Sequence, residues 1–247
     1  MAMMDPELYS QYHGMQRDVV KFFLKNYLNT TKWKSNDTVL DIGCGSGEAT
    51  MEQLAPSLPQ DFKKLVGLDI CPDIVNVAKR QNKNPKIDFI VCDISSKDIN
   101  KYVHEKFDHI FSFTCLQWVQ NQRQAMHNIY NLLKPGGDIQ FMFVERSPIY
   151  DIYESMASNP KWSRFMEDAN LYISPYHHCE DPVTIYKNIL VEEGFTVNEC
   201  IVVEIEGLLP SLSELKKSLL AVNPFFKRIP ESMRNDYVND YIKEFLC

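Results

Sequence analysis

The nine residues from Val39 to Gly47 combine an apolar run with three closely spaced glycines, in the sequence VLDIGCGSG. The β-branched start predicts a strand, the glycines predict a tight turn, and a helix is expected to open at Glu48. Glycine suits such a turn because a side chain would collide with a ligand that lies against the backbone. The free N–H groups of the following helix would face that ligand. The stretch therefore predicts a binding site for an anionic or hydroxyl-bearing group.

Two nucleotide-type cofactors are bound by loops of this kind. A dinucleotide fingerprint would read G-x-G-x-x-G, followed by an acidic residue about 20 positions later. Here the spacing is G-x-G-x-G, Asp41 precedes the loop, and the next acid at an expected strand end is Asp69, 28 positions after Asp41. This pattern resembles motif I of the class I S-adenosylmethionine (SAM) methyltransferases, which implies SAM as the cofactor. A nicotinamide cofactor and a glycine-rich turn without a ligand are the alternatives.

The rest of the chain must position this loop, and its pattern predicts alternating strands and helices. The expected strands are the apolar runs at 38–43, 64–70, 87–93, 107–113 and 138–144. The expected helices lie at about 48–55, 72–82, 97–103 and 122–133. Alternation at this spacing is typical of a doubly wound parallel sheet with right-handed crossovers. The predicted fold class is therefore α/β, of the class I SAM methyltransferase type.

In such sheets a ligand binds outside the carboxyl ends of the strands. Asp69 follows the second predicted strand and could accept from both hydroxyls of a ribose. Asp93 follows the third and could accept from the amino group of adenine. Either carboxylate could instead cap the N-terminus of the next helix. The residues expected to bind the cofactor are Asp41, Gly43, Cys44, Gly45, Asp69, Ile70, Asp93, Ile94 and Ser112.

The segments outside the alternating region are expected to be mostly helical. Helices are predicted within 8–28 and at 148–169, 181–193 and 211–246, with a strand at 196–205. One methyltransferase domain is expected over 1–247, divided into an N-terminal helical segment (1–35), a SAM-binding core (36–145) and a mostly helical cap (146–247). The aromatic residues that are frequent in the cap predict a second small core. Some of them could also line a pocket for an apolar substrate.

The net charge, the hydrophobic pattern and the cysteine content of the chain indicate which partners and which cellular compartment to expect. The formal net charge of −7 disfavours nucleic acid as a partner, because phosphate binding needs a basic face. No apolar run approaches the roughly 18 residues of a membrane span, and the start of the chain lacks the features of a signal peptide. Seven cysteines without paired spacing favour reduced thiols in the cytoplasm. No metal ion is expected, and His177-His178-Cys179 is interpreted as a polar loop.

Beyond the glycine loop, the chain is similar to the insect juvenile hormone acid O-methyltransferases over nearly its whole length. The segments that carry this resemblance are Leu8-Tyr9, Gln16-Arg17-Asp18, Phe107 to Phe113, Cys115 to Gln120, Asn128 to Pro135, Lys161 to Met166 and Ile173-Ser174-Pro175. The resemblance implies methyl transfer from SAM to the carboxylate of farnesoic acid or juvenile hormone acid, with a neutral methyl ester as the product. It also implies that Gln16 and Trp118 hold the substrate carboxylate.

A carboxylate substrate needs orientation more than activation. Because its pKa in water is about 4, it is already the nucleophile at neutral pH and needs no general base. Neutral N–H donors, such as the Gln16 amide and the Trp118 indole, can fix one oxygen without quenching it in a tight ion pair. Arg17 could add charge attraction. The alternatives are an ordinary polar helix position for Gln16, a core aromatic for Trp118 and a solvated or helix-paired Arg17.

Departures from the family pattern bear on both the substrate and the sheet. Gln117 stands where the family usually has histidine and Thr114 where an aromatic is common, so the substrate could be another fatty acid. Members of the family end in an antiparallel strand that this sequence is not expected to supply, so we expect the 138–144 strand to keep an unpaired edge unless 196–205 pairs beside it. A non-catalytic form that binds SAM or a lipid is the third possibility. A monomer or homodimer is expected.

Overall fold

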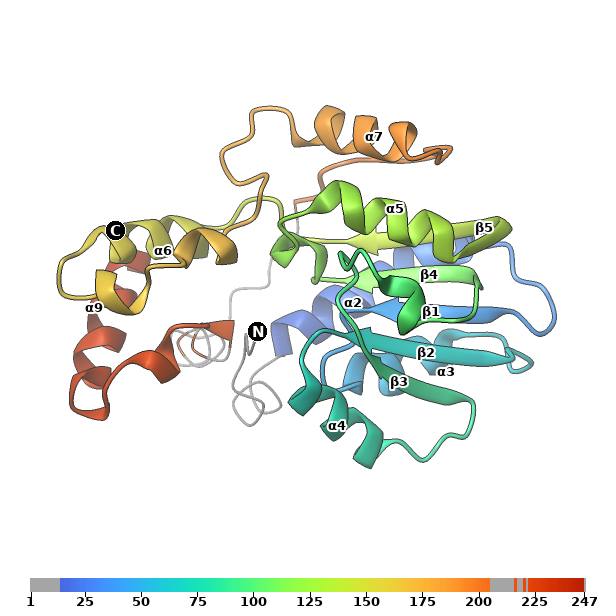
Figure 1. Cartoon of the computed structure of the whole chain (residues 1–247), viewed down its shortest axis with the longest axis horizontal. Helices are drawn as coiled ribbons and strands as arrows, with labels where there is room; N and C mark the ends of the chain where they lie inside the picture. The colour runs from blue at the N-terminus through green and yellow to red at the C-terminus, as the bar shows by residue number, and fades with distance from the viewer. Residues whose placement is uncertain (1–13, 205–215, 217–219, 221, 247) are drawn as a thin grey trace.

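A computed structural model of the protein describes residues 14–204, 216, 220 and 222–246. Five parallel strands form one sheet in the order β3-β2-β1-β4-β5 (Figure 1). Their bounds are β1 Thr38–Ile42, β2 Lys64–Asp69, β3 Ile87–Val91, β4 Phe107–Phe113 and β5 Leu133–Met142. The strand order reverses between β1 and β4, which is the switch point of a doubly wound sheet. The predicted fold class is confirmed.

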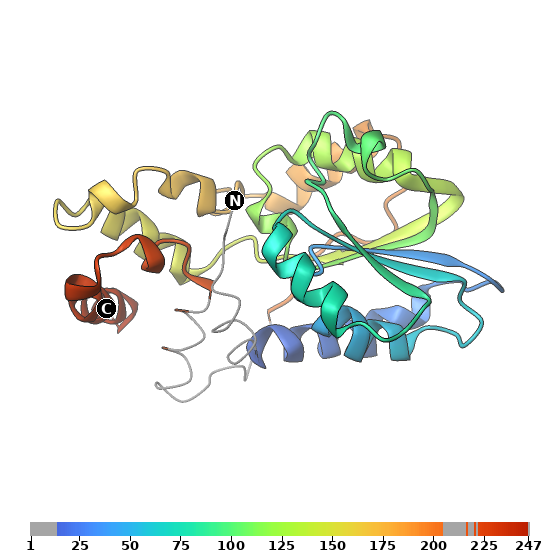
Figure 2. The same ribbon diagram turned by 60° about the horizontal axis from the view of Figure 1, so that its bottom comes forward.

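Side chains alternate between the two faces of the sheet, and each face packs against its own helices. Val39 and Phe111 belong to the core on one face, whereas Leu40 and Ile110 belong to the core on the other. Figure 2 shows α2 and α4 on one side of the sheet and α5 on the opposite side. The first face is covered by α2 Gly14–Tyr27, the π-helical turn η2 Thr50–Leu54, α3 Ala55–Ser57 and α4 Pro72–Gln81; the second is covered by α5 Gln122–Leu132 and α7 Pro182–Glu192.

The part of the chain after β5 builds a second core beside the sheet. There α6 (Pro148–Ser158) packs on α9 (Arg234–Leu246), at the left of Figure 1. Tyr153, Trp162 and Tyr237 are fully buried between them and the neighbouring turns, which confirms the expected second core. The remaining short helical turns are η1 Leu28–Thr30, η3 Ile99–Lys101, η4 Leu116–Trp118, η5 Ser163–Phe165, η6 Ala169–Tyr172, η7 Phe226–Arg228 and η8 Glu231–Met233.

Some expected elements have different bounds. The helix predicted at 148–169 ends at Ser158, because Asn159 takes an extended backbone before Pro160. The helix predicted at 97–103 is a single 3₁₀ turn. The strand predicted at 138–144 begins at Leu133, since the chain already pairs with β4 there through an irregular register.

The strand predicted at 196–205 is wrong over 196–204, which carries no strand, and residue 205 lies outside the described residues. Ile201, Val202 and Val203 have the β-branched side chains of a strand, but all three are exposed. A strand also needs a neighbour, and the outer edge of β5 has no strand partner in the described part of the chain. The helices predicted at 8–28 and 211–246 also lie partly outside that part.

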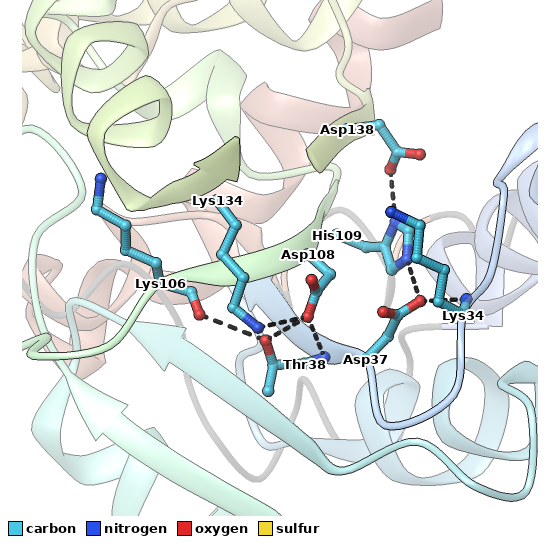
Figure 3. A network of polar contacts seen from close by, with 8 residues as sticks. All are labelled: Lys34, Asp37, Thr38, Lys106, Asp108, His109, Lys134 and Asp138. Carbon is cyan, nitrogen blue, oxygen red and sulfur yellow. Dashed lines mark hydrogen bonds and ion pairs between the residues drawn. The ribbon is translucent and has the colours of Figure 1, made fainter. Parts of the chain in front are cut away.

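A network of polar side chains joins β1, β4 and β5 where these strands begin (Figure 3). His109 is 4% exposed, with its Nε2 2.9 Å from Asp37 and its Nδ1 2.9 Å from Asp138. Beside it, Asp108 accepts from the backbone N–H and the hydroxyl of Thr38, both at 2.8 Å. An imidazole between two carboxylates donates to both only when both nitrogens are protonated. Although burial alone would lower it, the hydrogen bonds to Asp138 and Asp37 raise the pKa of His109.

None of the helices in the described ranges is both long enough and apolar enough to cross a membrane.

Candidate functional site

The glycine loop follows β1 directly. Gly43, Gly45 and Gly47 have positive φ values of +79°, +54° and +76°, which other residues rarely adopt. A side chain at Gly43 would also collide with Cys115, and one at Gly47 would collide with Phe89. The glycines are therefore needed for packing within the protein, in addition to the close approach of a ligand that the sequence indicates.

Two acidic side chains lie beside the loop, Asp41 buried and Asp69 half-buried. Asp41 is 2% exposed and accepts from the Thr50 hydroxyl at 2.6 Å. Burial raises the pKa of Asp41 to about 7, against the opposing effect of this hydrogen bond. Asp69 accepts from the N–H groups of Gly45 at 3.0 Å and Cys71 at 2.9 Å, and burial raises its pKa as well. Such a pair favours a ligand that brings positive charge and hydrogen-bond donors.

The other residues expected to bind the cofactor differ in whether their side chains are exposed or already hydrogen-bonded within the protein. Ile70 is 38% exposed and offers apolar surface. Asp93 accepts from the N–H and the hydroxyl of Ser95, both at 2.8 Å, which is a turn-capping role. Ile94 and Ser112 are 4% and 1% exposed, and the Ser112 hydroxyl donates to the main chain of β1 at 2.9 Å. At these two positions a ligand would meet main-chain atoms.

The thiols near the loop are buried. Cys44 is 7% exposed, and burial raises the pKa of its thiol and of the Cys115 thiol well above the ordinary value. Burial also raises the pKa of Cys92 to about 11. These cysteines therefore act as small apolar side chains that fill space around the loop.

The two residues expected to hold the substrate line the same cavity. Gln16 on α2 and Trp118 in the turn after β4 both line it. Tyr150, at the start of α6, lines it too and meets the Trp118 indole edge to face, with ring centroids 6.0 Å apart. The cavity volume is about 1630 Å³ because it continues along the unpaired edge of β5. The sequence identified Tyr150 only as one of many aromatic residues of the cap.

Two glutamine amides at the cavity have oxygen atoms without a donor. The Oε1 atoms of Gln16 and Gln117 are buried and accept no hydrogen bond from any described residue. Gln117 donates through Nε2 to the main-chain oxygen of Thr114 at 2.8 Å. Thr114 has a φ of +51°, which is strained for a β-branched residue. Gln117 thus holds a strained turn in place, and that hydrogen bond fixes which way its amide faces.

Arg17 is paired with acidic side chains of a neighbouring helical turn, which is one of the alternatives to a role in attracting the substrate. Its guanidinium lies 3.1 Å from Glu48 and 3.9 Å from Glu52, both directly after the glycine loop. It does not line the cavity. These ion pairs join α2, which carries Gln16, to the helical turn that follows the loop.

The chain matches the family model of the methyltransferase domain over residues 40–141, from β1 to β5. Juvenile hormone acid O-methyltransferase of Drosophila melanogaster is 35% identical over 239 residues, which are 95% of this chain and 80% of that protein. The enzyme of the same name from Bombyx mori is 34% identical over 241 residues, which are 97% of this chain and 85% of that protein.

Among solved structures, phosphoethanolamine N-methyltransferase 2 of Haemonchus contortus in complex with SAM has a TM-score of 0.57 at 19% identity, covering 98% of this chain and 53% of that one. The plantazolicin methyltransferase BamL, solved with S-adenosylhomocysteine, has a TM-score of 0.52 at 20% identity, covering 76% of this chain and 65% of that one. These likenesses concern the fold alone. On the strength of its identity to the two insect enzymes over nearly its whole length, the chain belongs to the juvenile hormone acid O-methyltransferase family of class I SAM-dependent methyltransferases.

Proposed function

We propose that this enzyme methylates the carboxylate of a sesquiterpenoid acid, farnesoic acid or juvenile hormone acid, to its methyl ester. The observation that carries the proposal is that Gln16 and Trp118, from two distant parts of the sequence, line one cavity. Phe22, Ile149 and Tyr150 line the same cavity and offer apolar surface to an isoprenoid tail. The names of the two insect relatives support this substrate class.

The residues around the glycine loop fit SAM. The cofactor carries positive charge and a ribose diol, which complement the buried carboxylate of Asp41 and the half-buried carboxylate of Asp69. The exposed side chain of Ile70 offers a surface to the adenine, and the main chain near Ile94 and Ser112 lies at the same edge of the sheet. When bound, SAM supplies an electrophilic methyl group on a positively charged sulfur.

The protein's own contribution is to bind and orient the acid. A carboxylic acid is ionised at neutral pH, since its pKa is about 4, so no side chain has to remove a proton. The Gln16 amide and the Trp118 indole donate to the carboxylate and hold one oxygen toward the methyl group. The indole N–H of Trp118 makes no hydrogen bond to any described residue, and Tyr150 packs against its ring. The apolar side chains of Phe22, Ile149 and Tyr150 at this end of the cavity would displace water that otherwise solvates the carboxylate.

Methylation of another apolar acid is the second candidate function, and Gln117 favours it. Its Oε1 is buried without a donor, and the hydrogen bond to Thr114 prevents the amide from turning. An acceptor near a carboxylate is unfavourable, so the acid would have to bind differently from one held beside a donor at this position. A straight-chain fatty acid, with a more flexible tail, is the alternative substrate.

The test is an assay of ester formation by mass spectrometry. The purified chain would be incubated with SAM and an equimolar mixture of farnesoic acid, juvenile hormone acid and straight-chain fatty acids. We expect a methyl farnesoate-type ester as the dominant product. Esters of the straight-chain acids alone would overturn the sesquiterpenoid assignment. If no ester forms while calorimetry still detects SAM binding, the protein is instead a non-catalytic binder.

We further propose that the enzyme works in the cytoplasm, as a monomer or homodimer, on a small apolar acid and without a nucleic-acid partner. The six described cysteines are all free, which agrees with a reducing compartment. The net charge of −7 agrees with the absence of a nucleic-acid partner.

A further inference from the structure

Two consecutive histidines in the loop before α7 each meet a carboxylate of α6. The Nε2 of His177 lies 3.0 Å from Asp151, and the Nε2 of His178 lies 2.7 Å from Glu154. Asp151 and Glu154 are three positions apart on α6 and therefore project from the same face of the helix. Two imidazole–carboxylate pairs thus lie side by side, with the two imidazole centroids 4.4 Å apart.

From this arrangement we propose that Glu154, His177 and His178 form a binding site for a divalent transition-metal ion of the zinc class. One possible ligand atom from each of these side chains lies within 4.8 Å of the others. Ligand atoms around a tetrahedral zinc ion are about 3.3 Å apart, given metal–ligand bonds of about 2.0 to 2.1 Å. His178 is exposed and Glu154 is partly exposed, so both side chains can make this small adjustment. Two imidazoles and a carboxylate suit zinc, with water as the fourth ligand.

His177 is the fixed point of the site. Its side chain is 3% exposed and packs edge to face on Tyr150, with ring centroids 5.1 Å apart. The hydrogen bond to Asp151 occupies one ring nitrogen, while the other, Nδ1, is buried without a partner in the described ranges. A histidine that ligates a metal through one nitrogen commonly donates to a carboxylate from the other. Asp151 therefore orients His177 without being a ligand itself.

The loop that carries the histidines is held in place before any ion binds. Arg146 donates to the main-chain oxygens of His177 at 3.3 Å and Cys179 at 3.1 Å. In the sequence the two histidines stand far from Asp151 and Glu154, and their own segment has a pattern that indicates a polar loop. The packing of α6 against this loop brings those two carboxylates to them. An ion here would fasten this loop to α6 directly behind Tyr150, which also packs on Trp118 at the cavity. The inference does not depend on the identity of the methylated acid.

The experiment measures metal binding by the full chain, free of any affinity tag and stripped with a chelator. Zinc would be titrated in competition with a chromogenic chelator, and cobalt(II) would be added to record its visible spectrum. We expect one zinc ion per chain and a tetrahedral cobalt spectrum without thiolate charge-transfer bands. A wild-type chain that binds neither ion overturns the proposal, as does a cobalt spectrum dominated by thiolate ligation.

Variants then identify the ligands. His178→Ala and Glu154→Gln should abolish the site or weaken zinc binding at least tenfold, and Asp151→Asn should weaken it roughly 10- to 100-fold, as expected for an orienting carboxylate. The matched control is His127→Ala, because His127 also pairs with a carboxylate, Glu193 at 3.0 Å, but outside this cluster. Circular dichroism checks that each variant folds. Equal zinc affinity in the wild type and the His178→Ala variant would overturn the assignment.

Discussion

Residues in and next to the cavity are of two kinds: some have donor groups available to a ligand, and others are engaged in contacts that hold the fold together. The indole N–H of Trp118 makes no hydrogen bond to any described residue, and its ring lies at the cavity against Tyr150. Arg17 follows Gln16 on the same helix but is engaged in ion pairs with Glu48 and Glu52. The availability of neutral donors, together with the engagement of the nearby cation, suits a carboxylate that must stay reactive.

Replacing Trp118 by phenylalanine tests the indole as a donor. The Trp118→Phe variant keeps a ring against Tyr150 but loses the N–H. A hydrogen bond to a charged group is worth about 1.5 to 3 kcal/mol, so kcat/KM for the sesquiterpenoid acid should fall roughly 10- to 150-fold, with little change in Tm. In the control Trp162→Phe, the lost indole bond to Asp240 lies in the cap core, so Tm should fall instead. An unchanged kcat/KM in Trp118→Phe would show that the indole does not hold the substrate.

Replacing Gln117 by histidine tests whether this position can hold the carboxylate. The Gln117→His variant exchanges an acceptor of fixed orientation for a ring that can donate toward the carboxylate. One such hydrogen bond, to a group that all the candidate acids share, should raise kcat/KM for the sesquiterpenoid and straight-chain acids alike by about tenfold. Gln120→His, at an exposed glutamine that bonds the main chain of Leu171, is the matched control. An unchanged kcat/KM in Gln117→His, or an equal rise in both variants, would contradict a position of Gln117 beside the carboxylate.

At the level of helices and strands, the sequence predicted most of what positions the cofactor site. Strands that are buried on both faces read as apolar runs, which is why β1, β2 and β4 could be located. The less buried β3 and β5 keep enough apolar residues to be recognised, and Asp69 and Asp93 could be placed at strand ends. Tyr150 could not be assigned to the cavity, because its position depends on how α6 packs beside the sheet. The positive φ of Thr114 could not be predicted either, since β-branched residues avoid it. The extended 196–204 segment has a strand pattern without a strand partner, and a pattern does not reveal its neighbours.

The start of the sheet should give a pH-dependent stability through His109. Burial alone would lower the pKa of His109, but the hydrogen bonds to Asp138 and Asp37 raise it above its ordinary value. The protonated ring therefore stabilises the fold. That stabilisation is fully present below the unfolded-state pKa of about 6.5 and is lost as the pH rises through the higher folded-state value.

Urea unfolding of the wild type and the His109→Gln variant between about pH 6 and pH 9 checks this sign. The variant should be less stable by about 1 to 3 kcal/mol near pH 6, because the buried carboxylate of Asp37 and the partly exposed one of Asp138 lose their charged partner. The difference should shrink toward pH 9. His127→Gln, at an exposed histidine, should differ little from the wild type at either pH. A His109→Gln difference that grows with pH would mean that the neutral ring is the stabilising form.

In the molecule as a whole, the cavity lies where the cap meets the sheet. The unpaired outer edge of β5 belongs to the same junction. Tyr150 reaches the cavity from the cap and Gln16 from α2, so cap and sheet together enclose the substrate end. Further along the same cavity, β5 faces the extended segment that contains Val202. Within the described residues, neither the outer edge of β5 nor this segment has a strand partner. Unpaired edges flanked by exposed apolar side chains promote association between chains.

We therefore expect the purified chain to associate reversibly as its concentration rises, which light scattering coupled to size-exclusion chromatography would measure. Val202→Lys should increase the monomer fraction, because a lysine on an open edge opposes pairing with another strand. Val191 on α7 is equally exposed, at 55% against 52% for Val202, so Val191→Lys is a control with the same change of charge away from the edge. If both lysine variants shift the monomer fraction equally, the effect is net charge and the edge is not the contact. A wild type that stays monomeric at every concentration would mean that its fold already protects the β5 edge, so that association through it plays no part in the behaviour of the enzyme.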